Sequence, residues 1–557
     1  MIEMTLREIA EVVGGTLHDA PDPEVTVTGS VEFDSRRIGS GDLFLALPGE
    51  QADGHDYAKA AVDAGAVAVL AARPVGVPAI VVAPSPGTVP AKSVALAGDS
   101  DGSGAAVLVA LATLARVSVE RLSAAGATGP EAVAERNHAG HHERGQSNTA
   151  AGGLTVIGVT GSSGKTSTKD LLAAVLTPLG PVVAPPGSFN NELGHPWTAL
   201  RADADTRFLV LELSARGPGH IAALARVAPP KIGVVLNVGA AHLGEFGSRE
   251  AIAQTKGELV EALPSTGLAV LNADDPQVAA MAARTQARVV TVGQAGNAEI
   301  RATDVHLDAE ARAGFTLHTK QGSIPVRLAV HGEHQVGNAL SAAAVALECG
   351  ADLDTIARAL GGAHAASARR MDVRTTADGI TVVNDSYNAN PDSVRAALKA
   401  LVTMSRVGDS PRRSWAVLGE MGELGEESVI EHDRIGRLAV RLDVSRLIVV
   451  GTGRPSHAMH QGAVMEGSWG EESILVPDIG AAIALLDSEV EPGDVVLVKA
   501  SKAVGLWAVA EHLTSAERAG TSRGSTEALG VSERSERTMD TAAFGRTTES
   551  SAGEAES

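Results

Sequence analysis

Apolar and polar residues alternate in short blocks along most of the chain, in the rhythm of strands followed by helices. In the middle of the chain the strand-like apolar runs are 154–159, 207–213, 232–238 and 268–273. The rhythm returns further on, with strand-like runs at 380–385, 414–419, 446–451 and 494–500. Because this alternation builds mostly parallel sheets with helices on their faces, we predict an α/β protein with a central domain at 154–365 and a second, smaller domain at 366–514.

The two ends of the chain and the stretch before the central domain follow other patterns. Residues 1–84 mix short strands with helices and predict a small α/β domain. Residues 85–153 combine a Pro-, Gly- and Ser-rich stretch, a helical pattern at 105–125 and an insertion at 126–153 with almost no apolar pattern, so we expect a variable helix and a flexible linker. Residues 515–557 have few apolar positions and predict a disordered tail.

Composition narrows the class of protein. Hydrophobic residues make up 44% of the 557 positions but aromatic residues only 2%, so Ala, Val and Leu fill most of the core. A formal net charge of −21 disfavours nucleic acid and anionic membranes as partners. The single cysteine, Cys349, excludes an internal disulfide and suits the reducing cytoplasm. No apolar run reaches the roughly 20 residues of a membrane span, so we expect a cytoplasmic protein without membrane insertion.

The stretch TVIGVTGSSGKTSTKD, residues 155–170, predicts a phosphate-binding loop. An apolar run leads into a Gly/Ser-rich turn, which ends in Gly-Lys-Thr and continues into a helical pattern. Glycines let backbone N–H groups face an anion, and the lysine and threonine of such loops reach the phosphates and Mg²⁺. We assign nucleotide binding to Thr160, Gly161, Ser162, Ser163, Gly164, Lys165, Thr166 and Ser167. The alternative is a plain strand-to-helix turn, since Val159 stands where the strict pattern has glycine.

Polar groups follow three other predicted strands. Glu212 ends an apolar run, where an acid near a phosphate loop is placed to bind Mg²⁺. His242 and Lys256 lie a helical stretch apart after the next strand. The stretch 384–398 presents many hydrogen-bonding groups at a strand end, which is the usual binding crevice of α/β proteins. Each of these features alone also fits a structural residue or an ordinary loop.

Taken together, the motifs resemble the Mur ligase family. The general marks of the family are TGSSGKTS, Glu212, the pair His242 and Lys256, LNADDP at 271–276 and GEHQVGNALSAAA at 332–344. The marks of its dipeptide-adding member are the N-terminal stretch 33–58, SFNNELGHP at 188–196, DSYNANPDS at 385–393 and LGEMGELG at 418–425. The resemblance covers about residues 5–84 and 154–512.

The resemblance implies a three-domain enzyme that uses ATP and Mg²⁺. The N-terminal domain would bind the uridine diphosphate end of UDP-N-acetylmuramoyl-tripeptide, and the central P-loop domain would bind ATP. The Rossmann-like C-terminal domain would complete the ATP site and admit D-alanyl-D-alanine. The tripeptide carboxylate would attack the γ-phosphate of ATP, and the dipeptide amine would attack the resulting acyl phosphate. The product would be the pentapeptide precursor of peptidoglycan, made by a cytoplasmic monomer.

The resemblance also implies roles for single residues. Those expected at the reacting groups are Lys165, Glu212, His242, Lys256 and Arg370. Thr166 and Glu212 would hold one Mg²⁺, while His242 and Lys256, the latter carbamylated by CO₂, would help to hold a second. The expected nucleotide contacts outside the loop are Asn272, at the adenine, Asn338 and Asp385. The expected contacts to the muramyl peptide and the dipeptide are Ser35, Arg36, Asn190, Asn191, Tyr387 and Asn388.

Several alternatives stay open. A folylpolyglutamate-type ligase would share the phosphate loop and the lysine but lack the N-terminal stretch 33–58, and a ligase adding the third peptide residue would carry an Asp-Asn-Pro motif that is absent here. A non-catalytic nucleotide-binding module would keep the loop without needing the acid, the histidine and the lysine together. Gln335, Ala500 and Lys502 stand where the family pattern has Asn, Gly and Arg. The sequence leaves open whether the third peptide residue is diaminopimelate or lysine.

Overall fold

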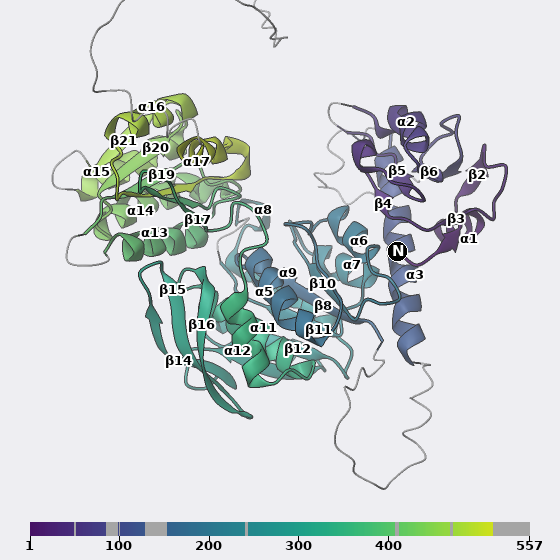
Figure 1. Cartoon of the computed structure of the whole chain (residues 1–557), viewed down its shortest axis with the longest axis horizontal. Coiled ribbons are helices and arrows are strands. Elements are labelled where there is room, and N and C mark those ends of the chain that lie inside the picture. The colour runs from purple at the N-terminus through teal and green to yellow at the C-terminus, as the bar shows by residue number, and fades with distance from the viewer. Residues whose placement is uncertain are drawn as a thin grey trace, which may run out of the picture. The chain divides into compact units, whose positions relative to one another are not determined.

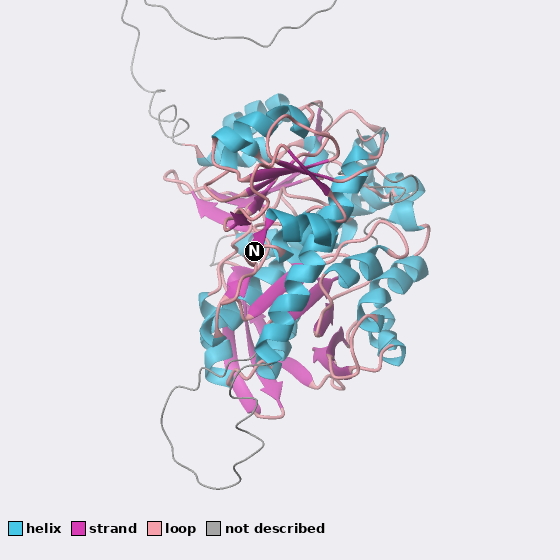
Figure 2. Cartoon of the chain, turned by 90° about the vertical axis from the view of Figure 1, so that its right-hand side faces the viewer, coloured by secondary structure: helices cyan, strands magenta, loops and turns pink. Residues whose placement is uncertain are grey.

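Runs rich in Val, Leu and Ala pair into three large sheets and one small one. The computed structural model describes residues 1–49, 52–84, 99, 101–127, 153–239, 243–406, 411–467 and 472–515. Within this range Met1–Thr514 form one compact unit. Figure 1 colours the elements in chain order, and Figure 2 shows helices packed beside the strands. The predicted α/β class is confirmed, because most neighbouring strands are parallel and helices connect them.

The N-terminal sheet has five strands in the order β2-β7-β6-β5-β4. Strands β4 to β7 pair in parallel, and β2 joins one edge antiparallel. The bounds are β2 (Thr16–His18), β4 (Val31–Glu32), β5 (Leu43–Leu45), β6 (Ala68–Ala71) and β7 (Ala79–Val81). The small sheet and the helices of this region are β1 (Met4–Thr5), β3 (Thr26–Val27), α1 (Leu6–Val13), α2 (Ala58–Asp63) and α3 (Ser103–Ala127). Strands β5 and β6 are buried throughout, as expected for parallel strands covered on both faces.

The central sheet has nine strands in the order β16-β15-β14-β13-β12-β11-β8-β10-β9. Its parallel part consists of β8 (Thr155–Thr160), β9 (Val182–Val183), β10 (Phe208–Glu212), β11 (Ile232–Val235), β12 (Leu268–Asn272), β13 (Arg288–Gly293) and β14 (Ile300–Leu307). Its helices are α5 (Lys165–Leu176), α6 (Gly194–Ala199), α7 (His220–Val227), α8 (Leu243–Phe246), α9 (Arg249–Glu261), α10 (Pro276–Ala279), α11 (Gln335–Glu348) and α12 (Leu353–Gly362). The carboxyl ends of β8, β10 and β11 therefore meet at one edge, where ligands bind in α/β sheets.

One edge of the central sheet departs from the rhythm expected between residues 154 and 365. Strands β14, β15 (Arg312–Thr319) and β16 (Gly322–His331) pair antiparallel, and no helix separates them. The connections at 308–311 and 320–321 have too few residues for the crossover that parallel pairing requires, so the chain folds back as hairpins. Buried and exposed positions partly alternate along β14 and β16, the pattern of strands with one covered face.

The C-terminal sheet has six strands in the order β17-β18-β22-β19-β20-β21, and all but the β17–β18 pair are parallel. Its strands are β17 (Asp372–Thr375), β18 (Thr381–Asn384), β19 (Ser414–Leu418), β20 (Arg446–Val450), β21 (Ser473–Val476) and β22 (Val495–Lys499). Its helices are α13 (Pro391–Ser405), α14 (Ser428–Arg441), α15 (Arg454–Glu466), α16 (Ile479–Glu489) and α17 (Trp507–Thr514). This order of parallel strands and helices agrees with the expected Rossmann-like domain.

Helix α13 begins at Pro391, within the polar stretch 384–398, and Asn390 caps it. The Asn390 side chain accepts a hydrogen bond from the Ser393 N–H at 2.9 Å, and the Ser393 hydroxyl lies 3.0 Å from the Asn390 N–H. Proline suits the first helical turn because its missing N–H would have no partner there.

Contacts between the sheets are made by a few polar and aromatic side chains. Trp197 of α6 donates its indole N–H to the carbonyl of Val31 in β4 at 2.8 Å. Lys169 of α5, which is 2% exposed, donates to the Ser367 hydroxyl at 3.1 Å, just before the C-terminal sheet. The large sheets span 16–81, 155–331 and 372–499, while the exact domain limits stay predictions. Most of the insertion at 126–153 and of the tail at 515–557 lies outside the described residues.

No helix in the described ranges combines the length and the apolar character needed to cross a membrane.

A buried carboxylate in the C-terminal sheet generates the first prediction. Asp494 accepts hydrogen bonds from the Trp415 indole at 2.9 Å and from the Arg413 guanidinium at 2.7 Å. Asp494→Ala leaves these donors without their acceptor, so the free energy of unfolding should fall by about 2–3 kcal/mol. Urea unfolding followed by tryptophan fluorescence measures the change.

Glu491→Ala is the matched control for this variant. Glu491 also pairs with Arg413, at 3.2 Å, but its side chain is 72% exposed. Exposed ion pairs contribute little, so the control should lose less than about 0.5 kcal/mol. Equal losses in the two variants would show that the buried hydrogen bonds of Asp494 do not stabilise the sheet.

Candidate active site

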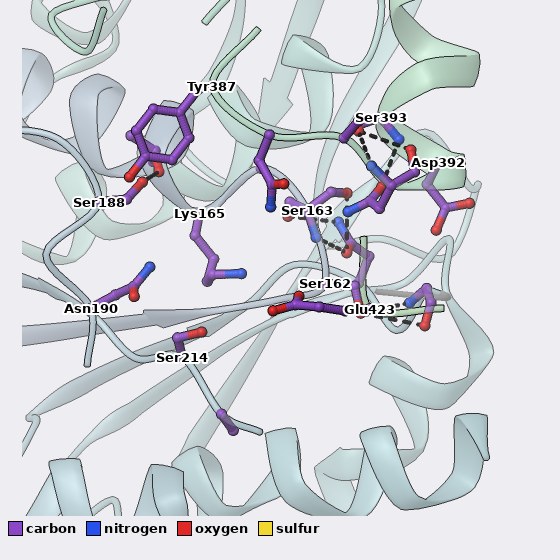
Figure 3. Close-up of a pocket in the computed structure, with 18 of the residues that line it drawn as sticks. Ser162, Ser163, Lys165, Ser188, Asn190, Ser214, Tyr387, Asp392, Ser393 and Glu423 are labelled. Atoms are coloured by element: carbon purple, nitrogen blue, oxygen red, sulfur yellow. Dashed lines mark hydrogen bonds between the residues drawn. The ribbon is translucent and has the colours of Figure 1, made fainter. Parts of the chain in front are cut away.

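A cavity of about 1660 Å³ lies at the carboxyl ends of the central strands. Its wall includes residues 162–167 of the phosphate loop (residues 160–167), Ser188 with residues 190–192 and, from the C-terminal part of the chain, Arg370 and most of residues 385–393. Figure 3 shows Lys165 in this cavity together with Ser188, Asn190 and Tyr387. Single small-molecule pockets have volumes of roughly 300–1,000 Å³, so this cavity has room for more than one ligand.

The predicted loop has the geometry of an anion cradle. Helix α5 starts at Lys165, and its N-cap Gly164 has φ +83° and makes no side-chain cap, so the first N–H groups of the helix remain available to a ligand. A Cβ at Gly164 would lie 2.7 Å from the Asn338 side-chain oxygen, and one at Gly161 would lie 2.9 Å from Leu236 Cβ. Asn237 holds the loop from below, accepting from the Ser163 N–H at 2.9 Å.

Lys165 carries the charge of the loop. Its ammonium group donates to the Gly161 carbonyl at 2.6 Å, which folds the side chain back over the loop. Loss of hydration in the cavity lowers the pKa of Lys165 to about 8, while the nearby Glu212 carboxylate opposes this shift. An anionic ligand would replace the missing solvation and favour the charged amine.

Glu212, at the end of β10, lies beneath the loop in a small polar cluster. Its Oε2 accepts from the Thr166 hydroxyl at 3.3 Å and from the Asn190 amide at 3.2 Å. Its Oε1 is buried and has no hydrogen-bond partner among the described residues. Burial raises the pKa of Glu212, although Lys165 acts in the opposite direction. An unpartnered carboxylate oxygen beside a threonine hydroxyl fits a hard cation such as Mg²⁺.

Arg370, at the start of the C-terminal part of the chain, places a second cation, after Lys165, beside the polar cluster of Glu212, Thr166 and Asn190. Its guanidinium donates to the Ser188 hydroxyl at 3.1 Å and to the Thr166 hydroxyl at 3.4 Å, and lies 4.2 Å from the centre of the Tyr387 ring. The flanking residues Arg369 and Met371 have φ values of +61° and +49°, which L-residues rarely adopt. Strain of this kind persists only where the surrounding contacts enforce it.

Asp385 lies at the far wall of the cavity, after β18. Its Oδ2 accepts from the Lys499 ammonium at 2.6 Å, and its Oδ1 accepts from the Met371 N–H at 3.2 Å. Lys499 also donates to the Asn388 carbonyl at 2.9 Å, so one buried cation fixes the whole turn after the strand. Burial lowers the pKa of Lys499, and its partner Asp385 opposes the shift.

Lys256 sits on α9, outside the lining of the cavity. It is 4% exposed, and no hydrogen bond or ion pair to another described residue satisfies it. Burial, with a further contribution from the charge of Lys165, lowers its pKa well below the usual value. A buried amine in this setting favours the neutral form. His242 lies outside the described residues.

The remaining predicted residues divide into two groups. The cavity wall contains Ser162, Ser163, Gly164, Thr166, Ser167, Asn190, Asn191, Asn338, Tyr387 and Asn388. The structure does not bring Thr160, Gly161, Asn272, Ser35 or Arg36 into that wall. The Asn272 amide donates to the Leu236 carbonyl at 2.8 Å, and the exposed Arg36 pairs with Asp34 at 2.8 Å in the N-terminal region. Their predicted ligand contacts stay predictions.

Sequence reasoning missed several polar residues of the cavity. They are Ser188, Ser214, Arg216, Arg249, His334, Glu423 and Lys499. A signal existed for Lys499, which ends a buried strand as Glu212 does. The others come from loops or helix starts, where no local pattern separates a cavity residue from a solvated one.

In the part of the chain that the structure describes, carboxylates, histidines and thiols do not by themselves form a metal site. Among the described residues no group of three or more His, Cys, Asp or Glu is arranged to hold a metal ion. A cation at Glu212 therefore requires other oxygen donors, such as the Thr166 hydroxyl, water or a ligand phosphate.

Comparisons with known proteins agree with the geometry. Residues 28–96, 159–346 and 369–502 match the Mur ligase family catalytic domain, the Mur ligase middle domain and the Mur ligase glutamate ligase domain, respectively. The UDP-N-acetylmuramoyl-tripeptide–D-alanyl-D-alanine ligase of Mycobacterium tuberculosis is 58% identical over 541 residues, which cover 94% of this chain and 100% of that protein.

Two solved structures share the fold and part of the sequence. A crystal structure of MurF from Acinetobacter baumannii has a TM-score of 0.73 and 28% identity, and the match covers 92% of this chain and 99% of that one. MurF from Thermotoga maritima, solved in complex with ADP, has a TM-score of 0.66 and 28% identity, covering 87% and 97% of the two chains. Since close relatives match over nearly the whole length and three family segments match in order, the chain belongs to the Mur ligase family.

Proposed function

We propose that the protein joins D-alanyl-D-alanine to UDP-N-acetylmuramoyl-tripeptide at the expense of ATP, giving the pentapeptide precursor of peptidoglycan, ADP and phosphate. The observation that carries this proposal is the 58% identity to a ligase of that name over 94% of the chain. The cavity supports it, because one space combines a phosphate loop, the cationic side chains of Lys165 and Arg370, and a volume large enough for several ligands.

ATP binds with its phosphates on the loop at the start of α5. The N–H groups of the loop and the Lys165 ammonium bind the β- and γ-phosphates, as in other P-loops. The ADP complex of the Thermotoga maritima relative supports nucleotide binding in this fold. Asn338 and Asp385 complete the nucleotide contacts from α11 and from the C-terminal sheet, and Asn272 contacts the adenine.

The first chemical step brings two anions together. The tripeptide carboxylate attacks the γ-phosphate, forming an acyl phosphate and releasing ADP. Arg370 and Lys165 neutralise the charge that builds up on the transferred group, which is the main task of a phosphoryl-transfer site. Arg370 is suited to this role because its guanidinium already lies 3.4 Å from the Thr166 hydroxyl.

The second step forms the amide. The amine of D-alanyl-D-alanine attacks the acyl phosphate, and phosphate leaves. Asn190 and Asn191 bind the muramyl peptide from the segment after Ser188, Ser35 and Arg36 bind its uridine diphosphate end, and Tyr387 and Asn388 bind from the C-terminal side. We further propose that the chain acts as a monomer in the cytoplasm, where ATP is supplied.

Two Mg²⁺ sites belong to this proposal. Thr166 and Glu212 hold one ion, and the unpartnered Glu212 oxygen supports that assignment. His242 and Lys256 help to hold the second, with Lys256 carbamylated by CO₂. Bound Mg²⁺ would supply positive charge against which the triphosphate and the carboxylate can approach. Carbamylation needs a neutral amine, and the lowered pKa of the buried Lys256 favours that form.

Product mass tests the proposed function. The protein is incubated with ATP, Mg²⁺, D-alanyl-D-alanine and a muramyl tripeptide that ends in either diaminopimelate or lysine. A product heavier by one dipeptide less one water, and phosphate release that needs all substrates, are expected. Addition of a single amino acid would assign the chain to another ligase of the family, and no product at all would favour a binding module.

Lys165→Ala tests the phosphate loop. Turnover should fall by a factor on the order of 10² or more, because the transition state loses a fixed cation. The exposed Lys320, which pairs with Glu299, provides the control Lys320→Ala, which should keep normal turnover. Phosphate release near the normal rate in Lys165→Ala would exclude this role.

Lys256→Ala tests the carbamate. The variant should lose at least on the order of 10²-fold in turnover, and short carboxylic acids such as acetate should restore part of it by replacing the missing oxygens. Lys256→Arg should stay inactive, since guanidinium keeps its charge and forms no carbamate.

The variant Lys165→Ala serves as a second control for this experiment. It lacks a cation rather than an anion, so acetate should not restore its turnover. Full activity of Lys256→Arg, or equal rescue of both alanine variants, would rule the carbamate out.

A further inference from the structure

The segment 188–190 connects the polar cluster under the phosphate loop to the N-terminal region. The N-terminal region contributes no described residue to the cavity wall. The segment has no helix or strand structure. Ser188 and Asn190 contact the polar cluster under the phosphate loop, whereas Phe189 between them packs against aromatic rings on another side. Within three consecutive residues, the outer two therefore contact the polar cluster and the middle one contacts aromatic rings.

The apolar contact is an aromatic cluster formed by Phe33, Phe189 and Trp197. The Phe189 and Trp197 ring centres lie 4.9 Å apart, and Phe33 lies 5.6 Å from Trp197 and 6.3 Å from Phe189. These separations are those of attractive aromatic pairs. Phe33 follows β4 of the N-terminal sheet, and the indole of Trp197 is tied to Val31 in the same strand, so the cluster anchors this segment to the N-terminal region.

Close packing leaves Phe189 little freedom. Gly194, the first residue of α6, would place a Cβ 2.7 Å from both Cα and Cβ of Phe189. Only glycine allows the helix to approach the backbone of the segment this closely. Trp197, on the same helix, is 1% exposed and holds the other side of the ring.

Ser188 and Asn190, on either side of Phe189, make polar contacts with residues that the proposed reaction uses. The Ser188 hydroxyl lies 2.6 Å from the Thr166 hydroxyl and accepts from Arg370 at 3.1 Å. The Asn190 amide donates to Glu212 at 3.2 Å, and its backbone carbonyl accepts from the Ser214 N–H at 3.1 Å. No strand ladder fixes Ser188, so its position depends on its neighbours in the segment.

We propose that Phe189 is a positioning residue for the reaction, an inference that rests on the proposed function. Packed against both Phe33 and Trp197, it fixes Ser188 and Asn190 against Thr166, Arg370 and Glu212. A shift of about 1 Å in such groups can cost about 10²-fold in rate, so a ring that touches no substrate still controls turnover. The N-terminal region thereby acts on the phosphate site through Phe33, without contacting the phosphates.

Kinetics of Phe189→Leu and Phe33→Leu test the proposal. For each variant kcat should fall at least about tenfold, while KM for D-alanyl-D-alanine stays near its normal value, because transition-state geometry is lost rather than binding. Affinity for ADP, measured by calorimetry without other substrates, should remain close to that of the unmodified protein, since the loop itself is intact. Phe189→Tyr keeps the ring and should restore most of kcat.

Phe315→Leu is the matched control. Phe315 lies in β15, is 3% exposed and does not line the cavity. Phe315→Leu, Phe189→Leu and Phe33→Leu should all show a lowered Tm, because each removes a packed ring. Only Phe315→Leu should keep an unchanged kcat. A normal kcat in Phe189→Leu, or an equal fall in kcat for Phe315→Leu, would overturn the proposal.

The outcomes also separate this proposal from the proposed function. If the unmodified protein forms no pentapeptide product, the proposed function fails, and the positioning role fails with it. If the unmodified protein is active but both leucine variants at positions 33 and 189 keep its kcat, only the positioning role fails. Should Phe189→Leu not fold, Phe33→Leu decides the question, because its ring lies on the N-terminal side of the cluster.

Discussion

The open N-terminus of α5 is the constraint on which the rest of the site depends. A helix start that is left uncapped has N–H groups that need an anion or water, and Gly164 at φ +83° keeps it uncapped. The neighbouring Asn338 oxygen leaves no room for a side chain at Gly164, and Asn237 fixes the turn from β11. Lys165, Thr166 and the end of β10 are then placed around the anion by the geometry of the strand–loop–helix unit.

Charge balance explains why the cavity needs groups from distant parts of the chain. Glu212 is buried beneath the loop with a raised pKa, and the amines of Lys165, Lys256 and Lys499 all have lowered pKa values because burial disfavours their charge. Burial therefore disfavours the charged form of each group, and a ligand of opposite charge would favour it. Arg370 remains the exception, since a guanidinium keeps its proton in proteins.

The join between the central and C-terminal parts is built from buried polar contacts next to strained backbone. Lys169 and Asp170 of α5 both bind Ser367, and positive φ values at Arg369 and Met371 follow directly. These contacts place the Arg370 guanidinium within hydrogen-bond distance of the Thr166 hydroxyl. On the opposite side, the aromatic cluster of Phe33, Phe189 and Trp197 attaches the N-terminal region to the same polar cluster. The phosphate site is thus held from three regions of the molecule.

Local chemistry determined a large part of this protein from the sequence alone. Strand and helix periodicity predicted the α/β class. Glycine positions and one lysine predicted the phosphate loop with a helix after it, because these features depend on neighbours in the chain. The hairpins of β14–β16 were missed, since connection length rather than periodicity decides between parallel and antiparallel pairing. The family was identified from its motifs, yet the contacts of Ser188 and Phe189 have no local signature, and the strand end at Lys499 does not reveal which groups it contacts. Only the tertiary structure decided them, because each depends on residues brought together from strands and loops far apart in the sequence.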